Sequence, residues 1–448
     1  MEPNCVQFLE NRTILVTGAS GFLAKVLVER ILRLQPNVKR LYLLVRASDK
    51  KSAEQRLHRE VFEKELFRVL RRNVGDESLN ALISEKVVPV PGDISLTDIG
   101  VHDSNLLQDM MQDIDIIISS AATTRFDERY DVALGINTFG AINVLNFAKK
   151  CVKPKLLLHV STAYVCGERP GHIVEKHFAM GESLNGKNKV DINTERRLAD
   201  QKSKQLKEQG QDFMGGQTHM SSPKQWEKCF LDTIEKLCQL TVDSVIIFYG
   251  KGILKCFLVD QKTVCDIIPV DMVVNAMIAI AADHCHDSGS HTVYHVGSSN
   301  QNPVIYKQIY EMMSRYFMKS PLVGRNGMLI VPKVTTISTL ARFRVYTNLR
   351  YKLPIQILGL LSVISPSQRD KFALHNRKFK MAMRLVKLYK PYVLFKGIFD
   401  DKNMGTLRIK NEAKDMEKLF GTNPKCIDWE DYFMNTHIPG LMTHVFKK

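Results

Sequence analysis

Two glycines and an alanine near the start of the chain, Gly18, Gly21 and Ala24, are spaced as G-x-x-G-x-x-A. A glycine at the first position permits a tight turn after a strand, and one at the second lets a diphosphate approach the backbone. The small third residue lets the next helix pack closely, and the helix N-terminus attracts phosphate. This spacing predicts a dinucleotide-binding turn rather than an ordinary strand-to-helix turn. The predicted contacts are these three residues together with Ser20, Phe22 and Leu23.

An arginine, Arg46, directly follows the second predicted strand. A site for NAD favours an acidic side chain at this position, which binds the ribose 2′-hydroxyl. A guanidinium pairs instead with the 2′-phosphate of NADPH. Arg46 therefore favours NADPH as the cofactor, with a solvated surface arginine as the alternative.

Three further segments fall at strand ends or on the next helix. Asp93, followed by Ile94, stands where a carboxylate accepts from the adenine amine. Ala121 and Ala122 are small enough to leave room for the nicotinamide ribose, and Asn137 lies on the helix beyond. Each alone is more typical of a turn or of core packing. In this order they match the pattern of extended short-chain dehydrogenases, so we predict that they contribute to the cofactor site.

The elements that must position these residues alternate between strand and helix. Strands are predicted at 12–17, 40–45, 86–90, 115–119 and 155–161, and helices at 22–34, within 50–85 and at 133–149. This alternation predicts an α/β fold with a Rossmann-type, doubly wound parallel sheet.

The alternation weakens after residue 171. Residues 182–225 are polar and rich in Gly, Gln, Lys and Asn, which predicts a loop or weakly ordered insertion. The run Thr241–Tyr249 fits a strand or a helix equally well. Helices are predicted at 226–240, 271–282 and 304–318, a strand at 291–297, and a basic, mainly helical region from about residue 326.

Several stretches resemble the alcohol-forming fatty acyl-CoA reductases of the plant type, which belong to the extended short-chain dehydrogenases. They are TGASGFLAK, LYLLVRAS, GDIS, VSTAYVCG, DSVIIFYGKGILKCF, DIIPVDMVVNAMI, YHVGSSNQNP and LYKPYVLFKGIFDDKN. The resemblance implies reduction of a long-chain fatty acyl-CoA to a primary alcohol with two NADPH. It also implies that Thr162, with Ser161 beside it, hydrogen-bonds the carbonyl oxygen, where negative charge develops. A polar strand end is the alternative for these two residues.

The resemblance also implies two domains. Residues 1–325 form an NADPH-binding reductase domain with a weakly ordered or truncated region at about 172–241. Residues 326–448 form a helical C-terminal domain.

One expected feature of this family is missing. The family takes its proton from a Tyr-x-x-x-Lys pair on the helix after the fifth strand, where the lysine lowers the tyrosine pKa. No such pair occurs between Gly167 and DSVIIFYGKG, nor does the apolar strand ending in Arg-Pro that usually follows. The chain's one Tyr-x-x-x-Lys, Tyr392 to Lys396, falls in the non-catalytic region. Tyr164 and Tyr249 are stand-ins without a lysine at this spacing.

The missing pair has a kinetic and a structural consequence. Loss of a general acid costs about 10²–10⁴ in rate, so we expect impaired activity. Loss of a helix and a strand is also expected to open the sheet beside the cofactor.

The formal net charge of +16 over 448 residues indicates either an anionic partner or a basic surface. The segment LPIQILGLLSVI lies between Arg350, Lys352, Arg369 and Lys371. Such a basic-edged apolar segment fits peripheral contact with an anionic membrane. A helical domain with a solvated basic face, or binding of coenzyme A phosphates, are the alternatives. The same apolar run is too short and interrupted to span a bilayer.

Other classes of site have little support. Zinc spacing, a helix-turn-helix cue and a basic region with stacking aromatics are absent, which argues against nucleic acid. His284-Cys285-His286 is adjacent in sequence and cannot converge on one ion from a regular element, so no metal is predicted. Without a recognisable signal or transit segment, the expected location is the cytosol or the cytosolic face of the endoplasmic reticulum.

Three functions remain open from the sequence. The first is an NADPH-dependent fatty acyl-CoA reductase of impaired activity. The second is a catalytically inactive NADPH- or lipid-binding homologue. The third is an extended short-chain dehydrogenase acting on a sterol or a nucleotide sugar, and the C-terminal resemblance counts against it.

Overall fold

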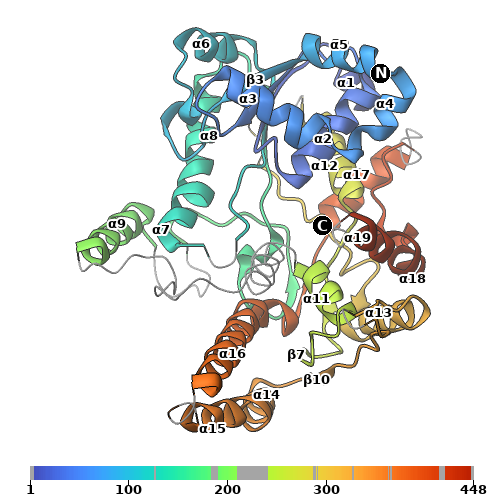
Figure 1. Cartoon of the computed structure of the whole chain (residues 1–448). Helices are drawn as coiled ribbons and strands as arrows, with labels where there is room; N and C mark the ends of the chain where they lie inside the picture. Colours follow the sequence, from blue (N-terminus) through green and yellow to red (C-terminus); the bar gives the residue numbers. More distant parts are fainter. Residues whose placement is uncertain are drawn as a thin grey trace.

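The computed structural model describes residues 5–125, 128–182, 190–208, 241–285, 289, 291–324, 327–361, 363, 366–412 and 419–444. Its centre is a five-stranded parallel sheet in the order β3-β2-β1-β4-β5 (Figure 1). The strands are β1 (Thr13–Thr17), β2 (Arg40–Val45), β3 (Val87–Pro91), β4 (Ile116–Ser119) and β5 (Leu156–His159). The predicted Rossmann-type, doubly wound sheet is confirmed.

The central strand β1 is buried along its whole length and pairs with β2 on one side and β4 on the other. Its sequence, TILVT, has the apolar β-branched character of a strand covered on both faces. The chain turns to opposite sides of the sheet from β1 and β4, which leaves a crevice beyond their carboxyl ends. That crevice is where a ligand is expected to bind.

Helices cover both faces of the sheet (Figure 1). Helices α2 (Phe22–Leu34) and α12 (Val270–His284) share one buried core with β1 and β2. In α2 the buried residues Ala24, Leu27, Val28, Ile31 and Leu32 follow the helical repeat. Helices α6 (Ser104–Asp113) and α8 (Gly140–Lys150) pack on the opposite face. The remaining helices of this part are α1 (Cys5–Phe8), α3 (Lys50–Leu57), α4 (Arg68–Val74), α5 (Asp76–Lys86) and α7 (Tyr130–Ala133).

Three small sheets join distant segments of the rest of the chain. Strand β6 (Gly171–Ile173) pairs with β11 (Gly397–Phe399), and β7 (Cys256–Leu258) pairs with β10 (Thr335–Ile337), both in parallel. Strands β8 (Val264–Cys265) and β9 (Val304–Ile305) are antiparallel. The helices are α11 (Thr241–Gly250), α13 (Tyr306–Lys319), α14 (Leu340–Thr347), α15 (Leu353–Leu361), α16 (Pro366–Val393), α17 (Lys402–Glu412), α18 (Trp429–Asp431) and α19 (Ile438–His444).

The buried cores draw on both sides of residue 325, where the domain boundary is predicted. Met404, Leu407 and Phe420 join the core of the central sheet. Phe433 and Ile438 pack with residues of α11 and α13. The C-terminal segments therefore complete cores that the first part of the chain begins.

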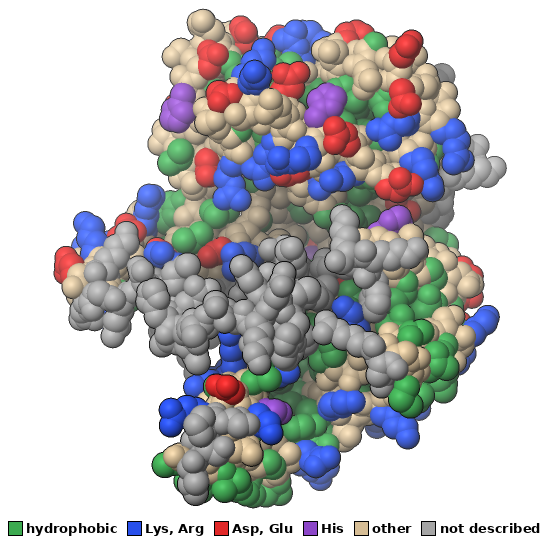
Figure 2. Space-filling view, viewed as in Figure 1, with side chains coloured by type: hydrophobic (Ala, Val, Ile, Leu, Met, Phe, Trp, Pro, Cys, Tyr) green, Lys and Arg blue, Asp and Glu red, His purple; other side chains and the backbone are tan. Residues whose placement is uncertain are grey.

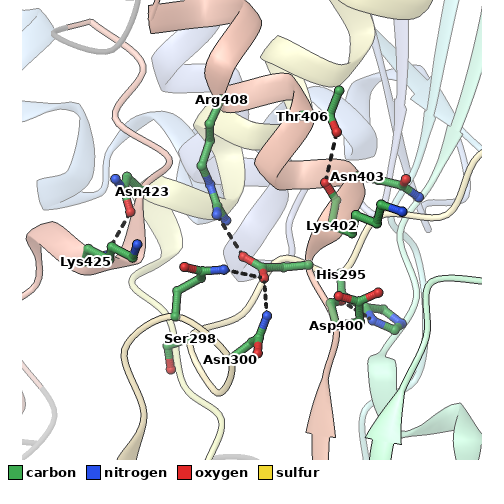
Figure 3. Close-up of polar contacts among 12 residues, drawn as sticks. His295, Ser298, Asn300, Asp400, Lys402, Asn403, Thr406, Arg408, Asn423 and Lys425 are labelled. Atoms are coloured by element: carbon green, nitrogen blue, oxygen red, sulfur yellow. Dashed lines mark hydrogen bonds and ion pairs between the residues drawn. The ribbon is translucent and has the colours of Figure 1, made fainter.

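A buried polar cluster fixes the start of α17 (Figure 3). The Asp401 carboxylate accepts hydrogen bonds from Asn300 Nδ2 at 2.9 Å, Gln301 Nε2 at 3.2 Å and Arg408 Nη1 at 2.8 Å. The side chains of Arg408 and Asp401 are only 8% and 4% exposed. Burial alone would raise the pKa of Asp401, but these hydrogen bonds outweigh it and hold the pKa below its ordinary value.

The predicted strand at 291–297 is wrong, because these residues adopt no regular secondary structure. The backbone N–H of His295 donates to Glu175 Oε1 at 2.7 Å instead of to a neighbouring strand. Tyr294 and Val296 still pack against the core of the central sheet. The segment thus has the composition of a strand but, among the described residues, no strand to pair with.

The predicted loop at 182–225 is wrong for residues 192–208, which form helix α9 (Ile192–Glu208). Asp191 begins this helix by accepting hydrogen bonds from the backbone N–H groups of Asn193 and Thr194. The helix lies against α7, where Tyr130 Oη donates to Glu195 at 2.9 Å. The rest of that predicted loop lies largely outside the described residues, and so does the predicted helix at 226–240.

The ambiguous run Thr241–Tyr249 is helical and belongs to α11. Among the described helices, none is long and apolar enough to cross a membrane.

The buried pair of Asp401 and Arg408 yields a stability prediction. The Arg408→Ala substitution leaves a buried carboxylate without its cation, so we expect the free energy of unfolding to fall by about 3–5 kcal/mol. Arg315→Ala, which removes an exposed pair with Glu430, is the control and is expected to cost under about 1 kcal/mol. Urea denaturation of both variants measures the difference, and equal costs would contradict this account of the cluster.

Candidate active site

The turn after β1 has no room for a side chain at Gly18. Gly18 has φ +69°, and a Cβ at this position would lie 2.8 Å from the Ala121 Cα. The backbone N–H of Gly21 donates to the Gly18 carbonyl oxygen at 2.8 Å and closes the turn. Helix α2 then begins without a side-chain cap and without an acidic residue in its first turn. A bare helix N-terminus behind a glycine turn fits the diphosphate of a dinucleotide.

The loop after β4, residues 120–124, is held against this turn from both ends. Thr17 Oγ1 accepts from the backbone N–H groups of Ser120 at 3.0 Å and Ala121 at 3.1 Å. Asn137 Oδ1 accepts from the Thr123 N–H at 2.8 Å, and its Nδ2 donates to the Thr123 carbonyl oxygen at 3.0 Å. Asn137 thus positions the loop, and the small side chains of Ala121 and Ala122 line the space beside it.

One cavity of about 990 Å³ lies beyond the carboxyl ends of β1, β4 and β5. It brings together most of the residues that the sequence predicts for the site: Gly18, Gly21, Phe22, Leu23, Ala24, Ala121, Ala122, Asn137, Ser161 and Thr162. Ser20, Arg46, Asp93 and Ile94 are not among its lining residues. The cavity therefore joins the predicted diphosphate turn directly to the predicted catalytic hydroxyls.

The far part of the same cavity is lined mainly by aliphatic and aromatic side chains. They come from α11, β7, α13 and α16, so segments more than two hundred residues from the turn contribute to one chamber. Examples are Val245, Phe257, Ile309, Met313 and Val393. This composition suits a long apolar substrate rather than a sugar.

The end of β5 supplies the polar groups at the middle of the cavity. Thr162 Oγ1 accepts a hydrogen bond from the Tyr164 backbone N–H at 3.3 Å and so begins a short helical turn. His159 Nδ1 lies 3.1 Å from Ser119 Oγ. Burial lowers the pKa of His159, which favours a neutral imidazole at neutral pH. Thr162 and Ser161 are accessible from the cavity, as a group that binds a carbonyl oxygen must be.

Several tyrosines line the cavity, but the described lining residues include no lysine. Burial raises the pKa of Tyr164, Tyr249, Tyr306 and Tyr392. Tyr164 packs edge-on against Tyr392, with ring centroids 5.0 Å apart. Helix α16 ends at Val393, so Tyr392 and Lys396 do not share one helix face. None of these four buried tyrosines therefore has the lowered pKa that makes an efficient proton donor.

The remaining predicted contacts lie around the turn. Arg46 is exposed, and its carbonyl oxygen accepts from Arg56 Nη1 at 2.8 Å. Arg56 also reaches Ser20 Oγ at 3.4 Å. Asp93 Oδ1 accepts from the backbone N–H and the hydroxyl of Ser95, both at 2.8 Å. Ile94 is buried in the core under α8. The roles assigned to these residues stay predictions.

Sequence reasoning missed at least four residues of this site. Arg56 lies on α3, ten residues after Arg46, and no motif marks it. His159 ends β5, and its position at the carboxyl edge of a predicted strand was a usable signal. Asp266 and Cys265 also line the cavity. No local sequence pattern predicts that their segment turns towards it.

The fold and the site define a nicotinamide-cofactor reductase of the Rossmann type. Two family models match the chain, both described as male sterility protein, over residues 16–218 with 236–277 and over residues 350–448. The chain is 70% identical to the putative fatty acyl-CoA reductase 7 of Arabidopsis thaliana, covering 97% of this chain and 98% of that one. It is 40% identical to the alcohol-forming fatty acyl-CoA reductase of Simmondsia chinensis, covering 98% of each. The chain belongs to the fatty acyl-CoA reductase family.

A solved structure has the same fold. The terminal R domain from the myxalamid PKS-NRPS biosynthetic pathway aligns with a TM-score of 0.54 at 19% identity, covering 98% of this chain and 92% of that one.

The comparisons bear on the missing segment. The alignment with fatty acyl-CoA reductase 1 of Arabidopsis thaliana, 53% identical, runs over 493 residues and covers all of this chain and all of that one. This chain has 448 residues, so the relative has positions without a counterpart here. The N-terminal family match also breaks off after residue 218 and resumes at 236. This chain therefore lacks positions that the relative has, and its N-terminal family match is interrupted before α11.

The Gly18 turn yields a test of the cofactor site. Gly18→Ala forces an L side chain into a left-handed conformation and against Ala121, so we expect nicotinamide cofactor affinity to fall on the order of tenfold or more. Gly405→Ala is the matched control, because a Cβ there meets no atom within 4 Å. Isothermal titration with NADPH measures both variants, and unchanged affinity in Gly18→Ala would rule out this turn as the diphosphate site.

Proposed function

We propose that the protein uses NADPH to reduce long-chain fatty acyl-CoA to primary alcohol, at a rate limited by the lack of an efficient proton donor. The observation that carries this proposal is the single cavity, which joins the glycine turn, the hydroxyls at the end of β5 and an apolar chamber. Family membership supports the substrate class. We also propose that the protein works in the cytosol or on the cytosolic face of the endoplasmic reticulum.

The preference for NADPH rests on charge around the turn. Arg46 is exposed, and Arg56 hydrogen-bonds both its carbonyl oxygen and Ser20 Oγ. The Arg56 guanidinium therefore lies between the Arg46 backbone and the glycine turn, and the exposed Arg46 side chain follows β2, where both arginines would give a 2′-phosphate charge-assisted hydrogen bonds. Glu60 pairs with Arg56 at 3.0 Å and holds this arginine in place.

The chain's own residues have separate tasks in the reaction. Bound NADPH would supply the hydride. The glycine turn and the loop at residues 120–124 hold the cofactor against the end of β5. Thr162 donates a hydrogen bond to the carbonyl oxygen, and the apolar chamber excludes water from the acyl chain. The proton for the alkoxide has no tyrosine paired with a lysine to donate it among the described lining residues, and burial disfavours ionisation of Tyr164, Tyr306 and Tyr392 there.

A catalytically inactive NADPH-binding protein is the second candidate function. It is favoured by the same absence of lysine from the described cavity lining. Measured turnover separates the two candidates, because both require cofactor binding.

The cofactor preference is tested by two substitutions. Each guanidinium bonded to a phosphate contributes about 1.5–3 kcal/mol, so Arg46→Ser and Arg56→Ser are each expected to weaken NADPH binding at least tenfold. NADH binding is expected to change little, because NADH lacks the 2′-phosphate. Titration of both cofactors against both variants gives the comparison, and an equal loss for NADH would argue against the assigned role.

The rate proposal is tested by restoring the missing segment. The chimera carries the part of the Simmondsia chinensis reductase that has no counterpart here, inserted just before Thr241, at the end of the region that the sequence predicts to be truncated. This position lies outside the described residues. Alcohol and aldehyde formed from acyl-CoAs of several chain lengths are measured by gas chromatography. We expect the unaltered chain to turn over slowly and the chimera to gain about 10²–10⁴ in rate.

The control in this experiment is NADPH affinity, which the chimera is expected to keep. A fast unaltered chain would contradict the rate limit. Absence of any product from both proteins, with NADPH bound, would favour the inactive binding protein.

A further inference from the structure

The excess positive charge of the chain is confined to one segment. Residues 312–399 contain seventeen lysines and arginines and a single acidic residue, Asp370. Their net charge equals the +16 of the entire chain. The segment includes the end of α13, β10 and β11, and most of it forms α14, α15 and α16, which lie at the lower end of the molecule in Figure 1, away from the central sheet. Such a separation of charge indicates a surface for an anionic partner.

The same end of the molecule exposes a row of large apolar side chains. Val345, Leu349, Leu353, Ile357 and Leu360 are 59%, 64%, 48%, 50% and 74% exposed. They follow one another at intervals of three or four residues, so they form one stripe along α14 and α15. The π-helical turn Asn348–Lys352 joins the two helices. Side chains spaced four residues apart shift gradually around an α-helix, because one α-helical turn takes fewer than four residues. A π-helical turn takes more residues, so it offsets this shift and keeps the row on one face.

The other side of α15 is already occupied by α16. A Cβ at Gly359 would lie 2.9 Å from the Phe372 ring, so the two helices pack closely there. Ile355 and Leu358 are half-buried, whereas Leu353, Ile357 and Leu360 stay exposed. The apolar stripe is therefore not needed for packing within the described part of the chain.

Basic side chains border the stripe. Arg342, Arg344, Arg350 and Lys352 are exposed on the same helical run. Figure 2 shows hydrophobic and basic side chains gathered at the lower end of the molecule, with few acidic ones. A row of leucines between cations complements a bilayer surface, where acyl chains lie beneath anionic headgroups.

We propose that the stripe on α14 and α15, with its basic border, docks in the plane of an anionic phospholipid bilayer. The last turn of α16 lines the cavity through Tyr389, Tyr392 and Val393. The helix that α15 packs on therefore leads from the docked surface to the apolar chamber. This arrangement places the chamber close to the membrane in which long-chain substrates and products collect. Docking itself does not depend on turnover, so its test is separate from that of the proposed function.

Vesicle flotation with the full chain tests the proposal. At about 0.1 M salt, where the Debye length is near 10 Å, we expect flotation with phosphatidylcholine vesicles containing phosphatidylserine and little with phosphatidylcholine alone. Leu349→Glu with Leu360→Glu is expected to lower the bound fraction at least tenfold. The matched control is Val152→Glu with Ile409→Glu, because these two residues are 64% and 70% exposed outside the segment. The control is expected to bind like the unaltered chain.

A second set of variants isolates the charge. Arg344→Gln, Arg350→Gln and Lys352→Gln together are expected to weaken binding about fivefold for each residue replaced. Lys50→Gln, Lys51→Gln and Lys64→Gln, which remove exposed charges near α3, are expected to change it little. Far-ultraviolet circular dichroism confirms that each variant is folded.

Two results would overturn the proposal. One is the absence of flotation by the unaltered chain with anionic vesicles, or equal flotation by the stripe variant and its control. The other is a dimer in light scattering without lipid that Leu349→Glu with Leu360→Glu dissociates, which would assign the stripe to a second copy of the chain.

Discussion

The close approach of two loops beyond the sheet is the constraint on which the rest of the site depends. Gly18 turns away from β1 so near to Ala121 that a side chain would strike the neighbouring backbone. Thr17 and Asn137 hold the loop of Ala121 in that position through hydrogen bonds to its backbone. The turn, the start of α2 and the entrance to the cavity therefore have one shared geometry. The hydroxyls of β5, the apolar chamber and the proposed position of the cofactor all share this reference.

Within the described part of the chain, the central sheet ends at β5, next to this site. Among the described strands, β5 pairs with β4 alone, and residues 291–297 run without a strand partner although their sequence is typical of one. Relatives of the family have positions that this chain lacks. The loss of a helix and a strand that the sequence predicts would account for both features, because the strand would pair at the open edge and the helix would carry the tyrosine and lysine. Such a loss would affect proton supply, whereas the glycine turn after β1 is present.

Much of the fold follows from local pattern. The strand at 40–45 and the helix at 22–34 agree with the structure to the residue, because one is a continuous buried apolar run and the other has strict helical spacing. The sequence pattern gave a wrong prediction at 291–297, where the residues are typical of a strand. A strand forms only when a neighbouring strand is available to pair with, and the composition of a segment does not show whether one is. The sequence pattern also failed at α9, whose apolar content is low and whose start depends on a single capping carboxylate, Asp191.

Of the site, the glycine turn and the β5 hydroxyls were predictable from motifs. Arg56 was not, because only the folded loop brings it beside Arg46.

The central claim is that a complete cofactor site has lost its proton donor, and chemical rescue tests it most directly. The fluorescence of bound NADPH is followed in a single turnover with a long-chain aldehyde, while the concentration of a small external acid such as imidazolium is raised at constant pH. This account predicts a slow oxidation of NADPH whose rate rises in proportion to the external acid, because the acid replaces the missing side chain. A fast rate that does not depend on the external acid would contradict it.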